Sequence, residues 1–258
     1  MTISDSSRLE RQRRDREYYD ALWLQLQQGR DLVVPADEEC FRQDLGHLLR
    51  CTWEMAGDLR GKRVLELGCG SGDYTVMLAR RGAEVWATDI APEALRTTRL
   101  RAAANGVADA IRPVLANAEA LPLAEASFDR VFGFGVLHHI DVAGAAPEIR
   151  RVLRHGGQAL FREPLGENPL LEWARAHVPY RQKNRSPNES PLTYDVIRAM
   201  GRHFSRTDVR EMYLLSMVAR AVGSESRWEG LWRLDEWLLA RLPAARRLCR
   251  YVIVRYTA

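Results

Sequence analysis

The stretch that decides the fold reads Val64-Leu65-Glu66-Leu67-Gly68-Cys69-Gly70-Ser71-Gly72-Asp73-Tyr74. It predicts a short buried strand, a glycine-rich turn and the start of a helix. Glycine permits left-handed backbone conformations and lets a ligand approach the chain closely, so three glycines spaced two apart suit a turn that cradles a ligand. A second apolar run ends at Asp89. A carboxylate at that position can accept hydrogen bonds from both hydroxyls of a ribose.

The spacing of the glycines separates two classes of cofactor. The dinucleotide fingerprint is G-x-G-x-x-G, whereas here Gly72 comes one residue too early for it. Glu66 lies two residues before Gly68, and a carboxylate beside the turn would repel a pyrophosphate and attract an ammonium or sulfonium. The pattern favours a cationic, adenosine-containing cofactor. A nicotinamide-dependent dehydrogenase remains as an alternative that the spacing disfavours.

The hydrophobic pattern along the chain alternates strand and helix, as in a doubly wound α/β sheet. Strands are predicted at 63–67, 84–88, 111–115, 129–134, 157–163, 205–214 and 250–257. Helices are predicted at 8–28, 37–57, 73–81, 92–104, 142–154 and 193–203. Because ligands of such sheets bind outside the carboxyl ends of the strands, the glycine turn and Asp89 meet at one site.

In combination these segments resemble the class I S-adenosylmethionine (SAM) dependent methyltransferases, within the small-molecule group, methyltransferase type 11, that includes quinone-biosynthesis enzymes. Besides the glycine turn, the resemblance rests on the segments 89–91, 117–123, 127–140 and 150–157. It covers roughly residues 60 to 164. It implies a Rossmann-like, seven-stranded sheet of order 3-2-1-4-5-7-6 with N-terminal helices and lid insertions.

The resemblance and the composition together predict four parts. Residues 1–59 form an N-terminal helical cap and 60–163 the SAM-binding core. Residues 164–192 interrupt the alternation directly after the fifth strand, which predicts a substrate lid over the site. Residues 193–258 complete the core sheet, with a helical insertion near 215–249.

The resemblance implies a set of residues that contact SAM. They are Tyr19, Glu66, Gly68, Cys69, Gly70, Gly72, Asp73, Tyr74, Asp89, Ile90, Asn117, Ala118, Glu119, Gly133 and Gly135. Tyr19 begins a Tyr-Asp pair that touches the cofactor in the family, although packing of its helix on the sheet is an equal alternative. Asn117 departs from the family, which has Asp there. Its amide oxygen can still accept from an adenine amino group, so we expect binding with lower affinity.

Three residues are candidates for the chemistry. His138 and His139 follow the fourth strand, and histidine titrates near neutrality, as a general base must. His139 matches the histidine of the E-H-V pattern of related enzymes; the alternative is that both rings only shape the pocket. Glu163 ends the fifth strand, where it would orient a substrate hydroxyl or amine, or instead satisfy the backbone of the lid. The cysteines at 40, 51, 69 and 249 form no CxxC pair, so no metal is predicted.

Composition excludes several classes of partner. The 258 residues carry a net charge of +4, and the basic residues, all arginine except Lys62 and Lys183, are dispersed among nearly as many acids. We therefore expect no nucleic-acid binding. The N-terminus lacks a signal-peptide pattern and no apolar run is long enough to span a membrane, which predicts a cytoplasmic protein. The tryptophan-rich stretch 227–242 leaves open packing on the sheet, a homo-oligomer face or peripheral membrane contact.

These observations predict SAM-dependent methyl transfer to a small, hydrophobic metabolite or natural product, with O-methylation favoured and C-methylation next. Orientation of the reactants alone can supply ~7–11 kcal/mol of such a barrier, so no side chain need be indispensable. The alternative is a SAM-binding protein that does not methylate, either a regulatory subunit or a protein that uses SAM without methyl transfer.

Overall fold

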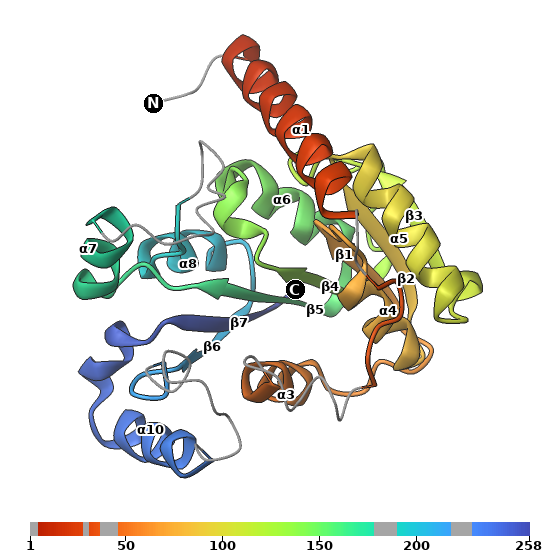
Figure 1. Ribbon diagram of the computed structural model, residues 1–258. Coiled ribbons are helices and arrows are strands. Elements are labelled where there is room, and N and C mark those ends of the chain that lie inside the picture. The colour runs from red at the N-terminus through yellow and green to blue at the C-terminus, as the bar shows by residue number, and fades with distance from the viewer. Residues whose placement is uncertain (1–4, 28–30, 37–45, 178–189, 218–228) are drawn as a thin grey trace.

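The sheet is built outward from its central strand, β1 (Arg63–Leu67). The computed structural model describes residues 5–27, 31–36, 46–177, 190–217 and 229–258. The other strands are β2 (Glu84–Asp89), β3 (Ile111–Leu115), β4 (Phe128–Phe134), β5 (Leu153–Pro164), β6 (Arg206–Met212) and β7 (Tyr251–Thr257). They form one sheet of order β3-β2-β1-β4-β5-β7-β6, in which β7 runs antiparallel to both of its neighbours (Figure 1). The predicted fold and strand order are confirmed.

Helices cover both faces of this sheet (Figure 1). They are α1 (Asp5–Gln27), α3 (Gly46–Ala56), α4 (Asp73–Arg80), α5 (Pro92–Ala104), α6 (Val142–Val152), α7 (Pro169–His177), α8 (Tyr194–Gly201) and α10 (Glu229–Arg241). Short 3-10 turns are η1 (Ala108–Ala110), η2 (Leu137–His139) and η4 (Pro243–Leu248). One hydrophobic core joins α3, α4 and α5 to the sheet, and a second joins α6 and α8 to its other face.

The central strands are apolar on both sides because both faces are covered. Val64 belongs to the core under α3 to α5, whereas Leu65 and Leu67 belong to the core under α6 and α8. All three are buried, and each such side chain contributes about 1.5–3 kcal/mol of hydrophobic free energy. This continuous burial places β1 at the centre of the sheet and its glycine turn at the edge between the two layers.

Most element boundaries agree with the predicted ones to within a few residues, and two differ more. The helix predicted at 37–57 is described only from Gly46, because residues 37–45 lie outside the described part of the chain. β5 begins at Leu153, before the predicted start at 157, since Leu153 pairs with Phe128 and the register then shifts between Phe128 and Arg130. Gly156 takes a left-handed φ of 73°, so the chain bulges within the strand where the sequence predicted the turn.

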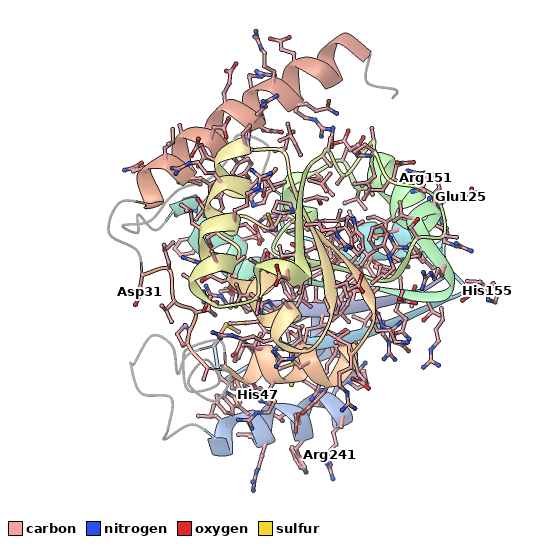
Figure 2. The ribbon with its side chains drawn as sticks, turned by 90° about the vertical axis from the view of Figure 1, so that its right-hand side faces the viewer. Asp31, His47, Glu125, Arg151, His155 and Arg241 are labelled. Atoms are coloured by element: carbon pink, nitrogen blue, oxygen red, sulfur yellow. The ribbon has the colours of Figure 1, made fainter. Side chains whose placement is uncertain are left out.

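The N-terminal helix α1 crosses the edge of the sheet and lies against α5 (Figures 1 and 2). An acid of α1 helps to begin α5: the Asp20 carboxylate accepts a hydrogen bond from the backbone amide of Glu93, 3.1 Å away. Pro92 stands at the first position of α5, where a missing N–H is harmless. The start of α5 is therefore tied to α1, which holds α1 above the carboxyl ends of the strands.

The tryptophan-rich helix α10 packs partly against α3. The Trp232 ring stacks on the His47 ring with 4.6 Å between centroids, and Figure 2 shows His47 beside α10. Trp237 remains 51% exposed on the same helix. Packing thus accounts for Trp232. The homo-oligomer and membrane alternatives for this stretch stay predictions. The predicted division of the chain into four parts also stays a prediction. In the described ranges, no helix has the length and apolar character needed to cross a membrane.

Candidate functional site

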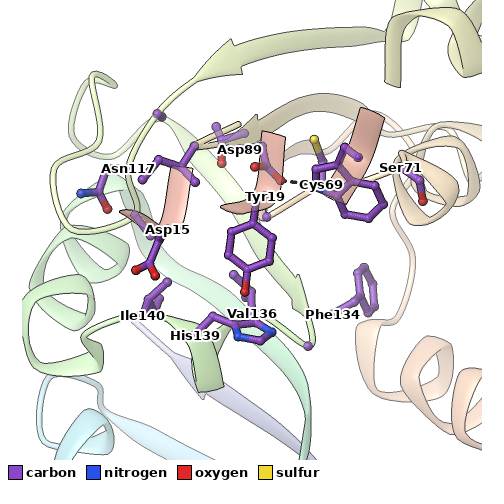
Figure 3. Close-up of a pocket in the computed structure, with 18 of the residues that line it drawn as sticks. Asp15, Tyr19, Cys69, Ser71, Asp89, Asn117, Phe134, Val136, His139 and Ile140 are labelled. Atoms are coloured by element: carbon purple, nitrogen blue, oxygen red, sulfur yellow. Dashed lines mark hydrogen bonds between the residues drawn. The ribbon is translucent and has the colours of Figure 1, made fainter. Parts of the chain in front are cut away.

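A cavity of about 310 Å³ opens at the carboxyl ends of β1, β2 and β4, beneath α1 (Figure 3). It lies where the chain order of the sheet reverses between β1 and β4, which is where ligands of doubly wound sheets bind. The predicted residues that line it are Tyr19, Gly68, Cys69, Gly70, Asp73, Tyr74, Asp89, Ile90, Asn117, Ala118, Glu119, Gly135 and His139. Segments far apart in the sequence therefore meet around one space.

The glycine turn forms the floor of the cavity, and only glycine fits it. Gly68 and Gly70 have φ values of 64° and 51°, in the left-handed region. A Cβ on Gly68 would stand 2.7 Å from a methyl group of Val136, and one on Gly70 would stand 2.7 Å from the Trp23 ring. The bare backbone of the turn is thus what faces a ligand.

Asp89 holds this turn and also faces the cavity. Its Oδ2 accepts from the Gly70 amide at 2.9 Å and its Oδ1 accepts from the Ala91 amide at 2.9 Å. Each carboxylate oxygen has a second lone pair, so the side chain can still accept from a ligand hydroxyl. Burial raises the pKa of the Asp89 carboxyl to about 6.

The loop after β3 supplies the next wall. Asn117 Oδ1 accepts from the Glu119 amide at 3.0 Å, which shapes a tight turn. The buried Glu119 carboxylate pairs with Arg11 and accepts from Gln12 Nε2 at 3.2 Å. It also accepts from the Asp141 amide at 3.2 Å. Glu119 therefore ties α1 to the β3 and β4 loops as well as lining the cavity.

One stripe of α1 closes the cavity from above. Gln12, Asp15, Tyr19 and Trp23 all line it, and Figure 3 shows Asp15 and Tyr19 reaching from α1 into the space. Of these, the sequence analysis named only Tyr19. The spacing of three or four residues is the signal that would have found the others, since it places them on one helical face. The analysis also missed Ser71, Thr88, Ala116, Phe134, Val136 and Ile140.

The charged side chains among the described residues that line the cavity are all acidic. Four carboxylates line it, those of Asp15, Asp73, Asp89 and Glu119, and no lysine or arginine is among the described lining residues. Ion pairs join Glu119 to Arg11 and Asp73 to Arg101. With acids as the charged groups among the described lining residues, the cavity favours a cation and disfavours a pyrophosphate. The carboxylates that line the cavity, together with the exposed backbone of the glycine turn, fit an adenosine that carries a cationic group.

Three predicted contacts lie behind the wall and do not line the cavity. Glu66 is 1% exposed, and its Oε2 accepts from the Thr75 hydroxyl at 2.5 Å. Burial raises its pKa to about 8, so the carboxyl is protonated at neutral pH. The expected anionic charge of Glu66 beside the turn is therefore corrected: the lining acids supply it. Gly72 packs against Thr98, and a Cβ on Gly133 would strike Phe161.

The turn η2 after β4 brings His139 to the cavity. The ring of Tyr19 meets that of His139 edge to face, with 5.6 Å between centroids (Figure 3). Burial, and secondarily the adjacent His138, lowers the pKa of His139 to about 3. The imidazole is therefore neutral throughout the physiological range and can accept a hydrogen bond from a ligand.

Glu163 organises η2 from below. It is fully buried, and Oε1 accepts from the amides of Val136 and Leu137, both at 2.9 Å. Its Oε2 stands 2.6 Å from Nδ1 of His138. Glu163 does not line the cavity, and His138 lines a neighbouring cavity of about 670 Å³ beside α6 and α8. The two histidines thus face different spaces, and only His139 of the three predicted catalytic residues faces the cavity under α1.

No metal site is apparent in the described part of the chain, where no group of three or more metal-binding side chains occurs. Cys51, Cys69 and Cys249 are buried free thiols. Cys51 Sγ lies 3.8 Å from His47 Nε2, and Cys40 lies outside the described residues.

Sequence comparisons match the core of the chain to a known family. Residues 65–161 match the family described as methyltransferase domain. An uncharacterized protein of Mycobacterium tuberculosis is 42% identical over 115 residues, which cover 44% of this chain and 40% of that protein. A ubiquinone/menaquinone biosynthesis C-methyltransferase of Pectobacterium atrosepticum is 38% identical, covering 44% and 47%. A ubiquinone biosynthesis O-methyltransferase of Alkalilimnicola ehrlichii is 37% identical, covering 44% and 45%. The chain spans less than half the length of these relatives.

Solved structures show the same fold over a longer stretch. Geranyl diphosphate C-methyltransferase from Streptomyces coelicolor has a TM-score of 0.59 at 18% identity, covering 83% of this chain and 80% of that one. The [4+2]-cyclase SpnF has a TM-score of 0.56 at 16% identity, covering 81% and 80%. At such identities the likeness establishes the architecture.

Proposed function

We propose that this chain, whose core belongs to the class I SAM-dependent methyltransferases, transfers a methyl group from SAM to a small, fairly hydrophobic metabolite. The observation that carries the proposal is the acidic cavity at the glycine turn, lined by four carboxylates and by no lysine or arginine of the described residues. Such a cavity suits a sulfonium better than a pyrophosphate, which argues against the dehydrogenase alternative.

The residues present can hold SAM at both ends. Asp89 would accept from the ribose hydroxyls, while Asn117 and Ala118 lie where the adenine belongs. The backbone of the turn at Gly68 and Gly70 would receive the amino-acid end. When bound, SAM supplies an electrophilic methyl group that a nucleophile displaces in line.

The protein itself positions the reacting groups and excludes water from them. Tyr19 and Trp23 of α1 cover the cavity, so a nucleophile inside it is shielded from solvent. We assign His139 the task of accepting the hydrogen bond of the nucleophile, because its ring is neutral and lines the cavity. Glu163 and His138 then act as positioning residues, since their contacts fix the turn that carries His139.

The acceptor belongs to the class of quinone, polyketide, isoprenoid or similar natural products, with O-methylation proposed before C-methylation. The cavity favours such an acceptor because Trp23, Phe134, Val136 and Ile140 give it apolar walls. An O-nucleophile fits the neutral His139 ring, which accepts a hydrogen bond from a hydroxyl. The lid predicted at 164–192 includes residues 178–189, which lie outside the described part.

One observation favours a second candidate, a SAM-binding protein that does not methylate. A histidine whose pKa is lowered to about 3 is a weak base, so the reaction cannot depend on His139 removing a proton from an alcohol of ordinary acidity. The fold is moreover shared with a [4+2]-cyclase. Direct detection of methyl transfer separates the two candidates.

The first experiment is calorimetric titration with SAM and S-adenosylhomocysteine (SAH). Micromolar binding is expected, followed by transfer of a labelled methyl group to members of a panel of phenols, quinols and polyketide hydroxyls. Binding of both ligands with no transfer to any acceptor would favour the second candidate. Binding of neither would contradict SAM use altogether.

A variant test then addresses His139. With an accepted substrate, His139→Ala should lower kcat up to about tenfold, because the change removes one hydrogen bond to the nucleophile, which contributes about 0.5–1.5 kcal/mol. His203→Ala, a residue outside the cavity under α1, serves as the matched control. If His139→Ala and His138→Ala both keep near-normal turnover, the histidines have no part in the reaction.

A further inference from the structure

Arg162, on β5, is a buried cation that the proposed mechanism does not use. Its side chain is 7% exposed, and Nη1 is a buried group without a hydrogen-bond partner. None of the described carboxylates forms an ion pair with Arg162. A buried charge without a counterion is unfavourable, and proteins retain such groups mainly where a ligand completes them.

The neighbours of Arg162 compensate its charge only in part. Its guanidinium lies 4.6 Å from the centroid of the Tyr74 ring and 5.1 Å from that of Phe134. Nη2 donates to the Tyr74 hydroxyl. Aromatic faces and a phenol oxygen attract a cation but carry no net charge, so the positive charge itself remains unmatched.

These contacts connect Arg162 to the cavity. Tyr74 and Phe134 stack with 4.2 Å between centroids, and both line the cavity, whereas Arg162 stands behind them. Because Nη2 donates to the Tyr74 oxygen, that bond does not use the phenol hydrogen, and Tyr74 itself lines the cavity. In a water-poor site a charge one ring away still acts strongly on a ligand.

The same wall lies on the acceptor side. Arg162 is opposite Phe134 in the β4–β5 register, and its carbonyl accepts from the Gly135 amide at 2.9 Å. Asp89 and Asn117, which suit the adenosine, stand on β2 and after β3, at the other end of the cavity. An anion beside Tyr74 is therefore no part of the adenosine. The carboxylate at the amino-acid end of the cofactor lies at the neighbouring glycine turn, so a protein saturated with SAH separates that anion from one carried by the second ligand.

We propose that Arg162 and Tyr74 form a recognition pair for an anionic group on an apolar methyl acceptor, a carboxylate, a phosphate or an ionised hydroxyl. This inference deepens the proposed function and rests on it. The stacked rings of Tyr74 and Phe134 receive the apolar body, the Tyr74 hydroxyl donates to the anion, and the guanidinium supplies the countercharge.

The test compares matched probes on the SAH-saturated protein. Benzoate and phenyl phosphate carry the two anions, and benzamide is a neutral molecule of the same shape as benzoate. Ligand-observed NMR or calorimetry should show at least one anion binding ten or more times as tightly as benzamide. Arg162→Met should remove that difference, and Tyr74→Phe should reduce it several-fold. Which anion binds more tightly distinguishes a carboxylate from a phosphate.

The control is another arginine stacked on aromatic rings. Arg63 lies 4.6 Å from the Trp86 centroid and 5.7 Å from that of Phe128, at the amino end of β1 and away from the cavity. Arg63→Met should leave the preference for anions intact. If Arg162→Met fails to fold, Arg162→Gln replaces it and should lose the preference, since the charge is removed while polar contacts to the Tyr74 hydroxyl remain available.

Two results would overturn the inference. One is that benzamide binds the wild-type protein as tightly as either anion. The other is that folded Arg162→Met retains the wild-type preference. Repeating the titrations without SAH keeps the two proposals distinguishable: absence of SAH binding would contradict the proposed function, while the ranking of the three probes still decides the role of Arg162.

Discussion

Asp89 and Glu163 are buried acids at the ends of two parallel strands, and each binds backbone amides of a neighbouring loop. Asp89 accepts from Gly70 and Ala91, while Glu163 accepts from two amides of the η2 segment. They differ in what lies beyond them. Asp89 lines the cavity, whereas Glu163 is fully buried and its second carboxylate oxygen contacts Nδ1 of His138.

A buried carboxylate at the end of a strand thus serves two different purposes in this protein. On the β1–β2 side, the acid shapes the glycine turn and also faces the ligand space. On the β4–β5 side, the acid only shapes the turn that carries His139. The difference arises because Asp89 lines the cavity at the crevice between β1 and β4, where the strand order reverses, whereas Glu163 is fully buried against the η2 segment. Position relative to that crevice, not residue type, decides which acid meets a ligand.

The strongest test of this contrast is Asp89→Ala. The change removes the proposed acceptor of two ribose hydroxyls, and each such charge-assisted hydrogen bond contributes about 1.5–3 kcal/mol. SAH affinity should therefore fall about 100-fold or more, measured by calorimetry. Asp58→Ala, at an exposed acid paired with Arg60, is the control and should bind normally. Retention of wild-type affinity in Asp89→Ala would remove Asp89 from the binding site.

Glu163→Gln should affect stability and spare cofactor binding. The amide keeps the shape of the side chain but loses the charge that stabilises two N–H groups and His138, which lowers the free energy of unfolding by about 1–3 kcal/mol. Urea denaturation measures this loss, and SAH titration should stay within about threefold of wild type. Glu84→Gln, at an exposed acid of β2, serves as control. A loss of SAH affinity as large as that of Asp89→Ala would erase the distinction between the two acids.

The pH dependence of SAH binding should report Asp89 alone. Its pKa is raised to about 6 by burial, so the carboxylate becomes protonated as the pH falls through 6 and then loses part of its capacity to accept. Affinity should be constant above pH 7 and weaken by up to about tenfold for each unit below pH 6. Calorimetry from pH 5 to 8 measures it, and Asp89→Asn should flatten the profile. His139 should contribute nothing here, because its pKa lies near 3.

The smallest expected effect is at the adenine end. In Asn117→Asp a carboxylate replaces the amide that accepts from the Glu119 amide, so the turn is kept while the acceptor for an adenine amino group gains a charge. SAH should bind a few-fold more tightly, by about 0.5–1.5 kcal/mol. Asn105→Asp, remote from the cavity, controls for the added charge. Equal or weaker binding in Asn117→Asp would show that residue 117 does not contact the adenine.

Local pattern predicted the strands and most of the β1–β2 side of the site, whereas the order of the strands in the sheet came from the family resemblance. Those features depend on short-range rules: period-two and period-3.6 hydrophobicity, glycine at left-handed positions and an acid at a strand end. The β4–β5 side was less predictable. The sequence analysis left Glu163 either to a substrate group or to the backbone of the lid, yet its partners are amides of the η2 segment, 26 and 27 residues away.

By itself the sequence determined the doubly wound core, the glycine turn and the acid Asp89, since neighbouring residues encode each of them. Tertiary structure alone decided which carboxyl groups face the cavity, that Glu66 is buried and neutral, and that a stripe of α1 closes the space. It also decided that Arg162 lies behind two stacked rings, with no counterion among the residues that the structure describes. Burial and contacts between distant segments set charge and access, and neither quantity is a property of any local stretch of chain.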